Sequence, residues 1–264
     1  MTVKVALTNE KGGVGKTSTA ISLGSALARR GRQVLIADLD PQCNATSALG
    51  LQKDAARSMH GLLLRDEPAA GAIVQTAVPG LSMLPSSVDM ASAEVELVPV
   101  MAREFRLRVS LSTLEGFDVV LIDCPPSLGL LTINALVAAD SVIVPVQCEY
   151  LALEGLAQLL STIDAVRVRL NPHLWILAIL LTMEDKRNRL SQQVAEEVTR
   201  HFPDVVARTR IPRSVRLAEA PSHGQPIDIY DPASRAAAAY AEFAHEVEDR
   251  LRRAAATVAA GAAS

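Results

Sequence analysis

The chain has 264 residues, 49% of them hydrophobic and only 3% aromatic, with a formal net charge of −3 at pH 7. This length and aliphatic composition favour one α/β domain, and the weak negative charge excludes a uniformly basic nucleic-acid binder. No stretch is long and apolar enough to span a membrane, and the three cysteines lack metal-ligand spacing, so we expect a cytoplasmic protein without disulfides.

The first predicted elements are a strand, a glycine-rich loop and a helix. Apolar alternation over residues 3–7 predicts the strand, and apolar residues at helical spacing over 20–28 predict a helix that Gly31 ends. The strand pattern begins too early to leave room for a signal peptide. The loop between the two elements reads Asn9-Glu10-Lys11-Gly12-Gly13-Val14-Gly15-Lys16-Thr17-Ser18.

This loop has the composition of a phosphate-binding loop. Its glycines let backbone N–H groups turn toward a bound phosphate, and the start of the helix adds positive partial charge. We expect residues 11–18 to hold a nucleotide, with Lys16 on its β- and γ-phosphates and the Thr17 hydroxyl on Mg²⁺. The alternative is a glycine-rich turn with two solvated lysines, which the glycine spacing and the strand–loop–helix context disfavour.

Two further buried strands are followed by acidic residues. Residues 34–37 form an apolar run before Asp38 and Asp40, and residues 119–122 form another before Asp123. An α/β sheet usually binds its ligand at the carboxyl ends of the strands, although position alone leaves the roles of the first two acids open. Asp123 beside a phosphate loop predicts a carboxylate that holds Mg²⁺ directly or through water, the alternative being an aspartate that caps the next helix.

The remaining pattern completes one domain. Strands are predicted at 81–85, 142–146, 176–182 and 205–211, helices from 86 to about 115 and at 153–170, 190–201 and 233–253, and a variable region at 45–80. We therefore predict a single P-loop NTPase domain of the α/β class over residues 1–253, with a mostly parallel twisted sheet flanked by helices on both faces. Residues 254–264, which are mostly Ala, Gly and Ser, are predicted to form a flexible tail.

Together these motifs resemble the deviant Walker ATPases of the ParA/Soj family. The resemblance rests on residues 11–17, 38–46 and 123–127, and it covers roughly residues 3–251. Residues 144–155 and 211–222 resemble the chromosomal branch of that family. Some plasmid relatives carry an amino-terminal helix-turn-helix, and this chain has no room for one before its phosphate loop, so sequence-specific DNA reading is not expected.

The resemblance implies an ATPase that uses ATP and Mg²⁺ and forms an ATP-dependent homodimer. In that family the extra lysine, here Lys11, crosses the dimer interface to the partner's bound phosphates, whereas Lys16 serves its own nucleotide. By the same resemblance Asp40 positions or activates the attacking water, and Thr17 and Asp123 organise Mg²⁺. Phosphoryl transfer depends mostly on positioning and electrostatics, so these groups are chemically sufficient for hydrolysis.

The resemblance also places Pro212 and its neighbours, including Ser214, beside the adenine. Three residues depart from the family pattern: Glu10 replaces a usual Gln, Cys43 a usual Gly and Ser214 a usual Asn. The loss of a Gly restricts the backbone of a loop that is expected to switch, so turnover and loop geometry are the properties affected. Ser214 can still form hydrogen bonds, but its side chain is shorter than that of Asn.

A local basic segment suggests contact with DNA. Residues 186–216 contain eight basic and three acidic residues, a local net charge of +5. Arg187 and Arg216 align with positions that the family uses for non-specific binding of double-stranded DNA in the ATP dimer. The alternative for each arginine is a solvated charged face or an intramolecular ion pair.

The family resemblance predicts a nucleoid-associated ATPase that segregates chromosomes or plasmids with a ParB/Spo0J-type partner, whose basic amino-terminal segment stimulates a slow hydrolysis. The main competing hypothesis is a MinD-like ATPase that positions cell division on membranes. The chain end at residues 250–258 has too few bulky apolar residues for a lipid-binding helix, so no stable membrane association is expected. The same scaffold could also serve a metabolic or redox enzyme, or a DNA-binding protein without turnover.

Overall fold

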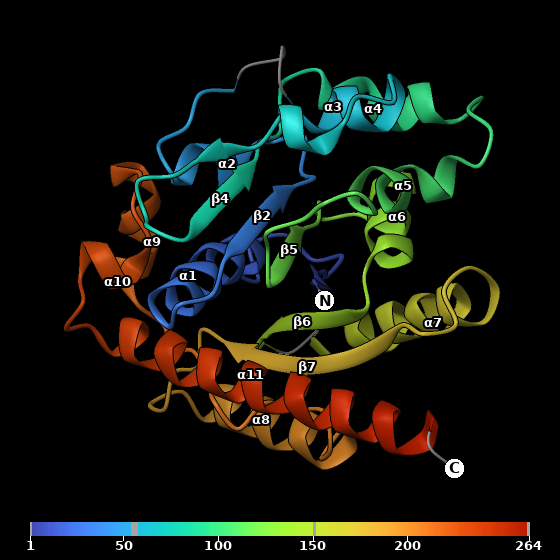
Figure 1. Cartoon of the computed structure of the whole chain (residues 1–264). Coiled ribbons are helices and arrows are strands. Elements are labelled where there is room, and N and C mark those ends of the chain that lie inside the picture. The colour runs from blue at the N-terminus through green and yellow to red at the C-terminus, as the bar shows by residue number, and fades with distance from the viewer. Residues whose placement is uncertain (1, 54–57, 150–151, 263–264) are drawn as a thin grey trace.

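The computed structural model describes residues 2–53, 58–149 and 152–262. Within these residues the chain forms a seven-stranded sheet of order β3-β4-β2-β5-β1-β6-β7, with helices on both of its faces (Figure 1). Only the β3–β4 pair is antiparallel, and the other neighbouring strands run parallel. The predicted fold class is confirmed.

The strands and helices have the following bounds. The strands are β1 Val3–Leu7, β2 Val34–Asp38, β3 Val74–Gln75, β4 Leu81–Leu84, β5 Val119–Asp123, β6 Ser141–Gln147 and β7 Trp175–Thr182. The helices are α1 Lys16–Arg29, α2 Asn44–Ala48, α3 Met59–Leu64, α4 Met90–Leu97, α5 Arg106–Leu111, α6 Leu130–Ala138, α7 Ala152–Arg169, α8 Arg189–His201, α9 Val215–Glu219, α10 Ile227–Tyr230 and α11 Arg235–Ala262. Among the described residues no helix is both long and apolar enough to cross a membrane.

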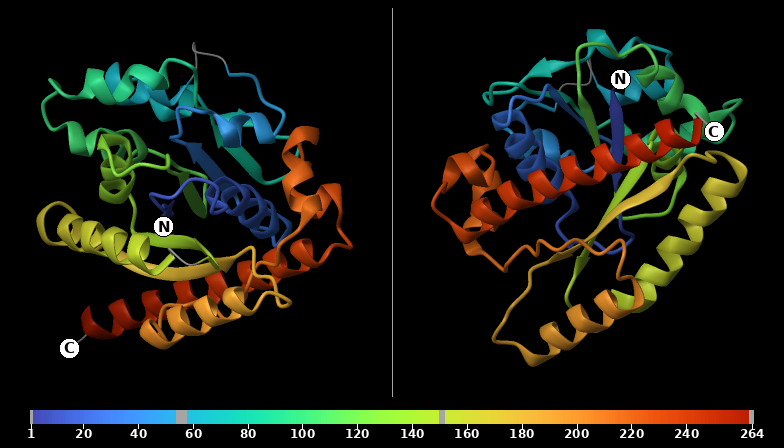
Figure 2. Two further views of the ribbon diagram at one scale, coloured as in Figure 1. Left: turned by 180° about the vertical axis from the view of Figure 1, so that it is seen from behind. Right: turned by 60° about the horizontal axis from the view of Figure 1, so that its bottom comes forward.

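The central strands are buried on both faces, which explains their continuous apolar sequences. Leu35 of β2 packs into a core that includes residues of α3 to α8, whereas its neighbour Ile36 points to the opposite core, with α1 and α11. Figure 2 shows the long red α11 lying beside the blue α1 on one side of the sheet. Each helix layer therefore covers one face of the sheet.

The parallel register places the predicted acidic residues at one edge. Asp123, at the end of β5, pairs in register with Asp38 of β2 on one side and with Leu7 of β1 on the other. The glycine-rich loop starts directly after β1. Because parallel strands present their carboxyl ends at the same edge, three segments that are far apart in the sequence meet there.

Three of the predicted elements differ from the structure. The predicted strand 205–211 forms only an isolated bridge through Val206, because its middle N–H groups bind a carboxylate of α11 instead of β7. The predicted helix 86–115 divides into α4 and α5, since Pro99 supplies no backbone N–H and Ala102 has a left-handed φ of 52°. The last helix continues past Arg253 to Ala262, as its alanines favour; the flexibility of residues 254–264 stays a prediction.

Candidate nucleotide-binding site

The loop after β1 adopts a conformation that glycine favours. Gly13 and Gly15 have φ values of 77° and 90°, in the left-handed region, where a side chain would introduce strain. Gly15 occupies the N-cap position of α1. Val14 between them is buried, and its carbonyl oxygen accepts a hydrogen bond of 2.8 Å from the Thr182 hydroxyl at the end of β7. The loop is thus fixed to the sheet at its centre.

Lys16 is buried against the loop backbone. Its ammonium donates hydrogen bonds to the carbonyl oxygens of Asn9, at 2.9 Å, and Lys11, at 3.2 Å. Burial lowers the pKa of Lys16, and the nearby Asp123 carboxylate opposes that shift. The Asn9 side chain in turn donates to the carbonyl of Pro145 and accepts from Lys11 N. The sequence analysis assigned no role to Asn9, because its contact with β6 is visible only in the fold.

Asp123 is the least satisfied charged group of the site. Its side chain is fully buried, and neither carboxylate oxygen has a hydrogen-bond partner within the described part of the chain. Burial, followed by the neighbouring Asp38, raises its pKa well above the ordinary value. A hard divalent cation prefers such oxygen ligands, so the residue fits the predicted Mg²⁺ role. The alternative as a helix cap does not hold, since α6 begins after Gly129 without a side-chain cap.

Asp38 differs from Asp123 in being fully engaged by its own loop. It accepts hydrogen bonds from Thr46 N at 2.8 Å, from Thr46 Oγ1 at 2.7 Å and from Asp40 N at 3.2 Å. Burial raises the pKa of Asp38 to about 6, and the bonds from Thr46 oppose this. Its position in the fold is that of a group that fixes the loop after β2.

Asp40 lies on that fixed loop and is 5% exposed. Its Oδ1 accepts a hydrogen bond of 2.9 Å from Gln42 N, and its carbonyl oxygen accepts one of 2.8 Å from the Ser86 hydroxyl. Ser86 N also donates to Thr46 Oγ1 at 3.0 Å. Ser86, which follows β4, therefore ties the Asp40 loop to the start of α4. The sequence carried no local signal for this contact, which spans 46 residues.

Cys43 retains the backbone conformation that the usual glycine would favour. Its φ is 54°, and its side chain is buried directly before α2. Left-handed conformations cost an L-residue about 1–2 kcal/mol. This departure from the family pattern therefore places strain in the loop that carries Asp40.

Lys11 and Lys16 make different contacts. Lys11 Nζ lies 2.8 Å from Glu149 Oε2, beyond the end of β6, and both side chains are about half exposed. Glu149 Oε1 also accepts a hydrogen bond from Gln147. Glu149 belongs to the segment 144–155 that resembles the chromosomal branch. The next two residues of that segment, Tyr150 and Leu151, lie outside the described residues.

A cavity of about 220 Å³ adjoins the loop where the adenine was expected. Its lining includes Gly15 of the loop, Ser18 of α1, and Pro212, Ser214 and Tyr240 from the carboxy-terminal half. The Ser214 hydroxyl accepts a hydrogen bond of 3.3 Å from Leu217 N and thereby caps α9. Tyr240, which the sequence analysis missed, is fully buried, and its hydroxyl lies 3.1 Å from Thr19 Oγ1 of α1.

The two predicted DNA-contacting arginines have different surroundings. Arg216 pairs with Glu219 at 3.1 Å and Asp231 at 3.6 Å, and its guanidinium lies 5.9 Å from the centre of the Tyr230 ring. These are the ion pairs of the alternative interpretation, although 59% of the side chain is exposed. Arg187 is exposed and has no side-chain ion pair within the described ranges.

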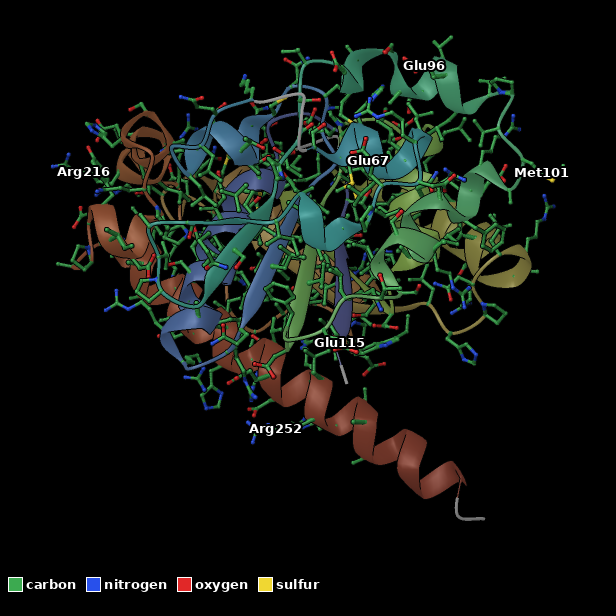
Figure 3. All side chains as sticks on the ribbon, turned by 45° about the horizontal axis from the view of Figure 1, so that its top comes forward. Glu67, Glu96, Met101, Glu115, Arg216 and Arg252 are labelled. Carbon is green, nitrogen blue, oxygen red and sulfur yellow. The ribbon has the colours of Figure 1, made fainter. Side chains whose placement is uncertain are left out.

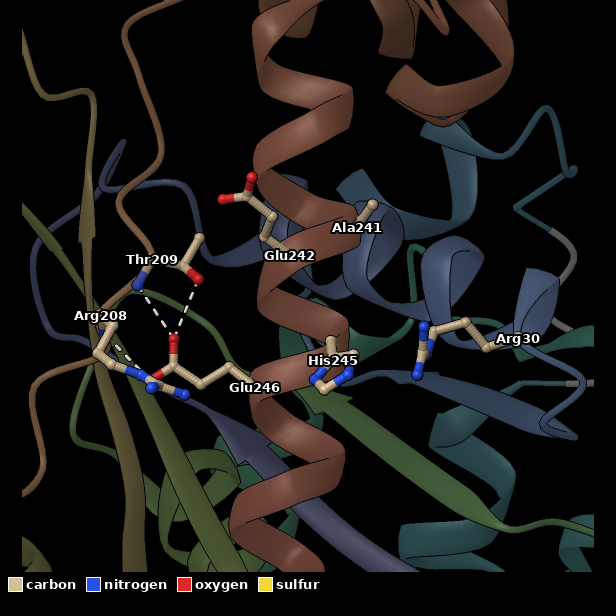
Figure 4. Close-up of a pocket in the computed structure, with 7 residues that line it drawn as sticks. All are labelled: Arg30, Arg208, Thr209, Ala241, Glu242, His245 and Glu246. Atoms are coloured by element: carbon tan, nitrogen blue, oxygen red, sulfur yellow. Dashed lines mark hydrogen bonds between the residues drawn. The ribbon is translucent and has the colours of Figure 1, made fainter.

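An open groove of about 510 Å³ along α11 lies apart from the nucleotide loop (Figure 4). Glu246 on its floor accepts hydrogen bonds from Arg208 N, Thr209 N and Thr209 Oγ1 at 2.9–3.0 Å, and it pairs with Arg250 at 2.9 Å. The carboxylate thus fastens the 205–211 segment to α11. We attribute a structural role to this groove.

Comparison with known proteins places the site in context. The family described as an AAA domain matches residues 2–176. The sporulation initiation inhibitor protein Soj of Bacillus subtilis is 53% identical over 92% of this chain and 97% of its own, and the chromosome partitioning protein ParA of Caulobacter vibrioides is 48% identical over 94% of each.

Solved structures show the same fold with nucleotide bound. A protein of Mycobacterium smegmatis described as cobyrinic acid a,c-diamide synthase, with an ATP analogue and magnesium, is 42% identical, with a TM-score of 0.81 and 93% of each chain covered. The septum site-determining protein MinD of Pyrococcus horikoshii, with Mg-ADP, is more distant, at 27% identity and a TM-score of 0.75 over 94% of this chain and 96% of its own.

Proposed function

Since the chain belongs to the ParA/Soj family of chromosome-partitioning ATPases, we propose that it is a nucleotide-controlled DNA-binding switch. ATP and Mg²⁺ bring two copies together, and the dimer binds double-stranded DNA of the nucleoid without sequence preference. A ParB-type partner then stimulates a slow hydrolysis, which returns the protein to a form that leaves the DNA.

The unpartnered, buried carboxylate of Asp123 beside the phosphate loop carries the proposal. Asp123 and Thr17 would hold Mg²⁺, which neutralises charge on the phosphates, while Lys16 contacts the β- and γ-phosphates of its own ATP. Asp40 lies on a loop that β2 and Ser86 fix, so it is suited to orienting the attacking water. These residues supply the positioning and electrostatic groups that phosphoryl transfer requires.

Lys11 is the residue that we assign to dimerisation. Its ion pair with Glu149 is exposed, and such pairs contribute about 1 kcal/mol or less, so a bound phosphate of a second copy can replace the carboxylate. Lys11 would then connect ATP binding in one copy with contact by the other. This assignment explains why one loop carries two lysines with different contacts.

DNA binding is assigned to Arg187 and Arg216. Dimerisation would place two copies of each arginine on one duplex, and each phosphate contact adds to affinity by releasing condensed counterions. Glu219, Asp231 and Tyr230 around Arg216 hold its guanidinium at the surface without burying it. Because ATP-dependent dimerisation precedes DNA binding, the affinity for DNA depends on ATP.

Binding to random-sequence duplex DNA tests the proposal. It is measured with ATP, with ADP and without nucleotide, at salt concentrations from about 50 to 200 mM. With about four phosphate contacts per dimer, affinity in ATP should fall on the order of a hundredfold over that range. Arg216→Ala should weaken binding and flatten the salt dependence, whereas Arg200→Ala, which removes an exposed arginine of the same basic segment that is not assigned to DNA, should do neither. Equal binding in all nucleotide states would refute the switch.

A second variant separates binding from turnover. Asp40→Ala should still dimerise in ATP but should not hydrolyse it, so it should remain on DNA for as long as ATP is present. An ATP-independent monomer would show that Asp40 acts in assembly instead. If no DNA binding occurs in any state, co-sedimentation with liposomes in ATP tests the membrane role of the more distant MinD relatives.

A further inference from the structure

The helix α4 carries apolar residues on both of its sides. Met90, Ala93 and Leu97 are buried in the core. Large apolar side chains are exposed on the opposite side of the helix and in the segments that flank it. These are Val88, Val95, Val98 and Met101, of which Val95 is 74% and Met101 90% exposed. Four large apolar side chains exposed within fourteen residues of chain indicate a surface that is covered in the working protein.

The same segment is acidic. Residues 88–104 contain four acidic side chains and one basic one, a local net charge of −3. In Figure 3, Glu96 and Met101 project from the same upper right part of the molecule. A second copy of this chain that docked by the same surface would bring acid against acid, because a twofold interface places identical patches together. The charge pattern instead fits a partner with basic residues beside an apolar stripe.

We propose that this surface, formed by Val88, Val95, Val98, Met101 and Glu96, binds a short basic amphipathic helix of the protein that stimulates hydrolysis. The proposal rests on the proposed function, since it assigns a docking site to the partner named there. Helix recognition of this kind depends on a few apolar anchors at helical spacing, with charges around them. We call it the outer α4 surface.

Two hydrogen bonds made by neighbours of the outer α4 surface lead toward the nucleotide site. Val88 lies two residues after Ser86, whose hydroxyl bonds to the carbonyl oxygen of Asp40 at 2.8 Å. At the other end of α4, the Glu94 carboxylate lies 3.5 Å from Leu131 N, in the first turn of α6. The loop before α6 begins at Asp123. A ligand on this surface would therefore press on elements that lead to both Asp40 and Asp123.

The segment after α4 is fixed to α6 as well. The Asn134 side chain of α6 accepts a hydrogen bond from Leu107 N at 3.1 Å and donates one to the carbonyl oxygen of Arg103 at 2.8 Å. Displacement of residues 98–105 would thus change the position of α6. This gives partner binding a physical route to the rate of hydrolysis.

The outer α4 surface is also distant from the proposed DNA contact. In Figure 3, Arg216 lies at the left edge of the molecule and Met101 at the right edge. A partner segment on α4 would not compete with DNA for Arg216. The protein could therefore hold DNA and its partner at the same time, as partner-stimulated release from DNA requires.

A labelled peptide tests the proposal. The probe is a fluorescein-labelled synthetic peptide of the amino-terminal thirty residues of the ParB-type protein encoded in the same genome, titrated by fluorescence anisotropy in ATP. The double variant Val95→Asp/Met101→Asp should weaken its binding by roughly tenfold or more, because each change removes an exposed anchor. Stimulation by the peptide should fall in parallel, while basal ATPase activity stays unchanged. Val168→Asp on α7, where the side chain is 77% exposed, is the matched control.

Two further measurements make the result decisive. Glu96→Gln should reduce the salt dependence of peptide binding, since it removes a bordering charge. On the unaltered protein, the peptide should slow hydrogen exchange in residues 88–104 more than in α7. If the double variant binds the peptide and is stimulated by it as strongly as the unaltered protein, the outer α4 surface is not the docking site. The partner role in the proposed function would then still stand. No peptide binding by the unaltered protein would overturn both this inference and the partner role, while ATP-dependent DNA binding would still stand.

Discussion

The ammonium of Lys11 lies 2.8 Å from the Glu149 carboxylate, and this contact occupies the lysine that we assign to the dimer interface. An exposed ion pair of this kind is weak, so it can hold the side chain in the single chain without preventing its transfer to a phosphate. Under the proposed role of Lys11, the pair and the dimer would compete for the same ammonium group.

Glu149→Gln should strengthen the ATP-dependent dimer. The change removes the competing charge from each of the two subunits, and two pairs worth about 1 kcal/mol or less each correspond to at most roughly a thirtyfold lower dissociation constant. Analytical ultracentrifugation in ATP measures the shift. Lys11→Ala is the companion variant and should keep nucleotide binding but lose the stable dimer. A weaker dimer in Glu149→Gln would show that Glu149 itself supports the interface.

At position 43 a glycine variant should be more stable than an alanine variant, which is the reverse of the usual order of stability. Cys43→Gly and Cys43→Ala both remove the buried thiol, but only glycine accepts the φ of 54° without strain. We expect the glycine variant to be more stable than the alanine variant by about 1 kcal/mol, measured by urea unfolding. Its ATPase rate reports whether the strain also limits the loop of Asp40. Higher stability of the alanine variant would contradict the strained backbone.

Asp123→Asn should stabilise the nucleotide-free protein while weakening its response to ATP. The carboxylate is buried without a partner, so replacing it by a neutral amide removes the cost of burying a charge. A gain of about 1 kcal/mol corresponds to an increase in Tm of about 2–4 °C for a chain of this size. Thermal unfolding with and without Mg-ATP measures both effects. A lower Tm in the absence of nucleotide would count against the unpaired charge.

Glu246→Gln should destabilise the protein by about 2–3 kcal/mol, because it disrupts charge-assisted hydrogen bonds to the backbone of Arg208 and Thr209 and to Arg250. Glu248→Gln is the matched control on the same helix. Its partners, Arg30 and Arg32, are more exposed, so it should cost less than about 1 kcal/mol. Chemical unfolding at pH 7 compares the free energies of unfolding of the two variants. Similar losses would show that the lower exposure of Arg250 does not make the Glu246 contacts stronger.

The effect of Glu246 should also depend on pH. Burial raises its pKa, but the hydrogen bonds from Arg208, Thr209 and Arg250 outweigh this, so the pKa in the folded protein lies below the ordinary value of 4.5. The unfolded chain therefore binds the proton more readily. The stabilisation is complete above about pH 4.5 and is lost as the pH falls through the folded pKa. The difference between the parent protein and Glu246→Gln should shrink over the same range.

The sequence predicted the parts of the site that depend on local pattern. Apolar strands followed by acidic residues, and a glycine-rich loop before a helix, were sufficient to bring Lys16, Asp40 and Asp123 to one edge of the sheet. Pro212 lines the cavity beside the phosphate loop, and its contact with the adenine stays a prediction. The chemical role of each of these residues stays a prediction.

Contacts between distant segments had no such signal. The bond from Ser86 to the Asp40 carbonyl and the pairing of Lys11 with Glu149 depend on how strands β4 and β6 are placed. The apolar pattern of residues 205–211 predicted a strand, but the backbone N–H groups of Arg208 and Thr209 donate to the Glu246 carboxylate instead. Ser214 had been assigned to the nucleotide on resemblance alone, and its hydroxyl caps α9 in the fold.

The hydroxyl contact between Thr19 and Tyr240 has a consequence for biosynthesis. It joins the helix of the phosphate loop to α11 across 221 residues of sequence, and the two helices pack along each other. A ribosome that adds about 5–20 residues per second needs roughly 10–45 s to pass from one to the other. During that interval the apolar side of α1 lacks its partner. Chaperones that shield exposed apolar helices therefore have time to act on the nascent chain.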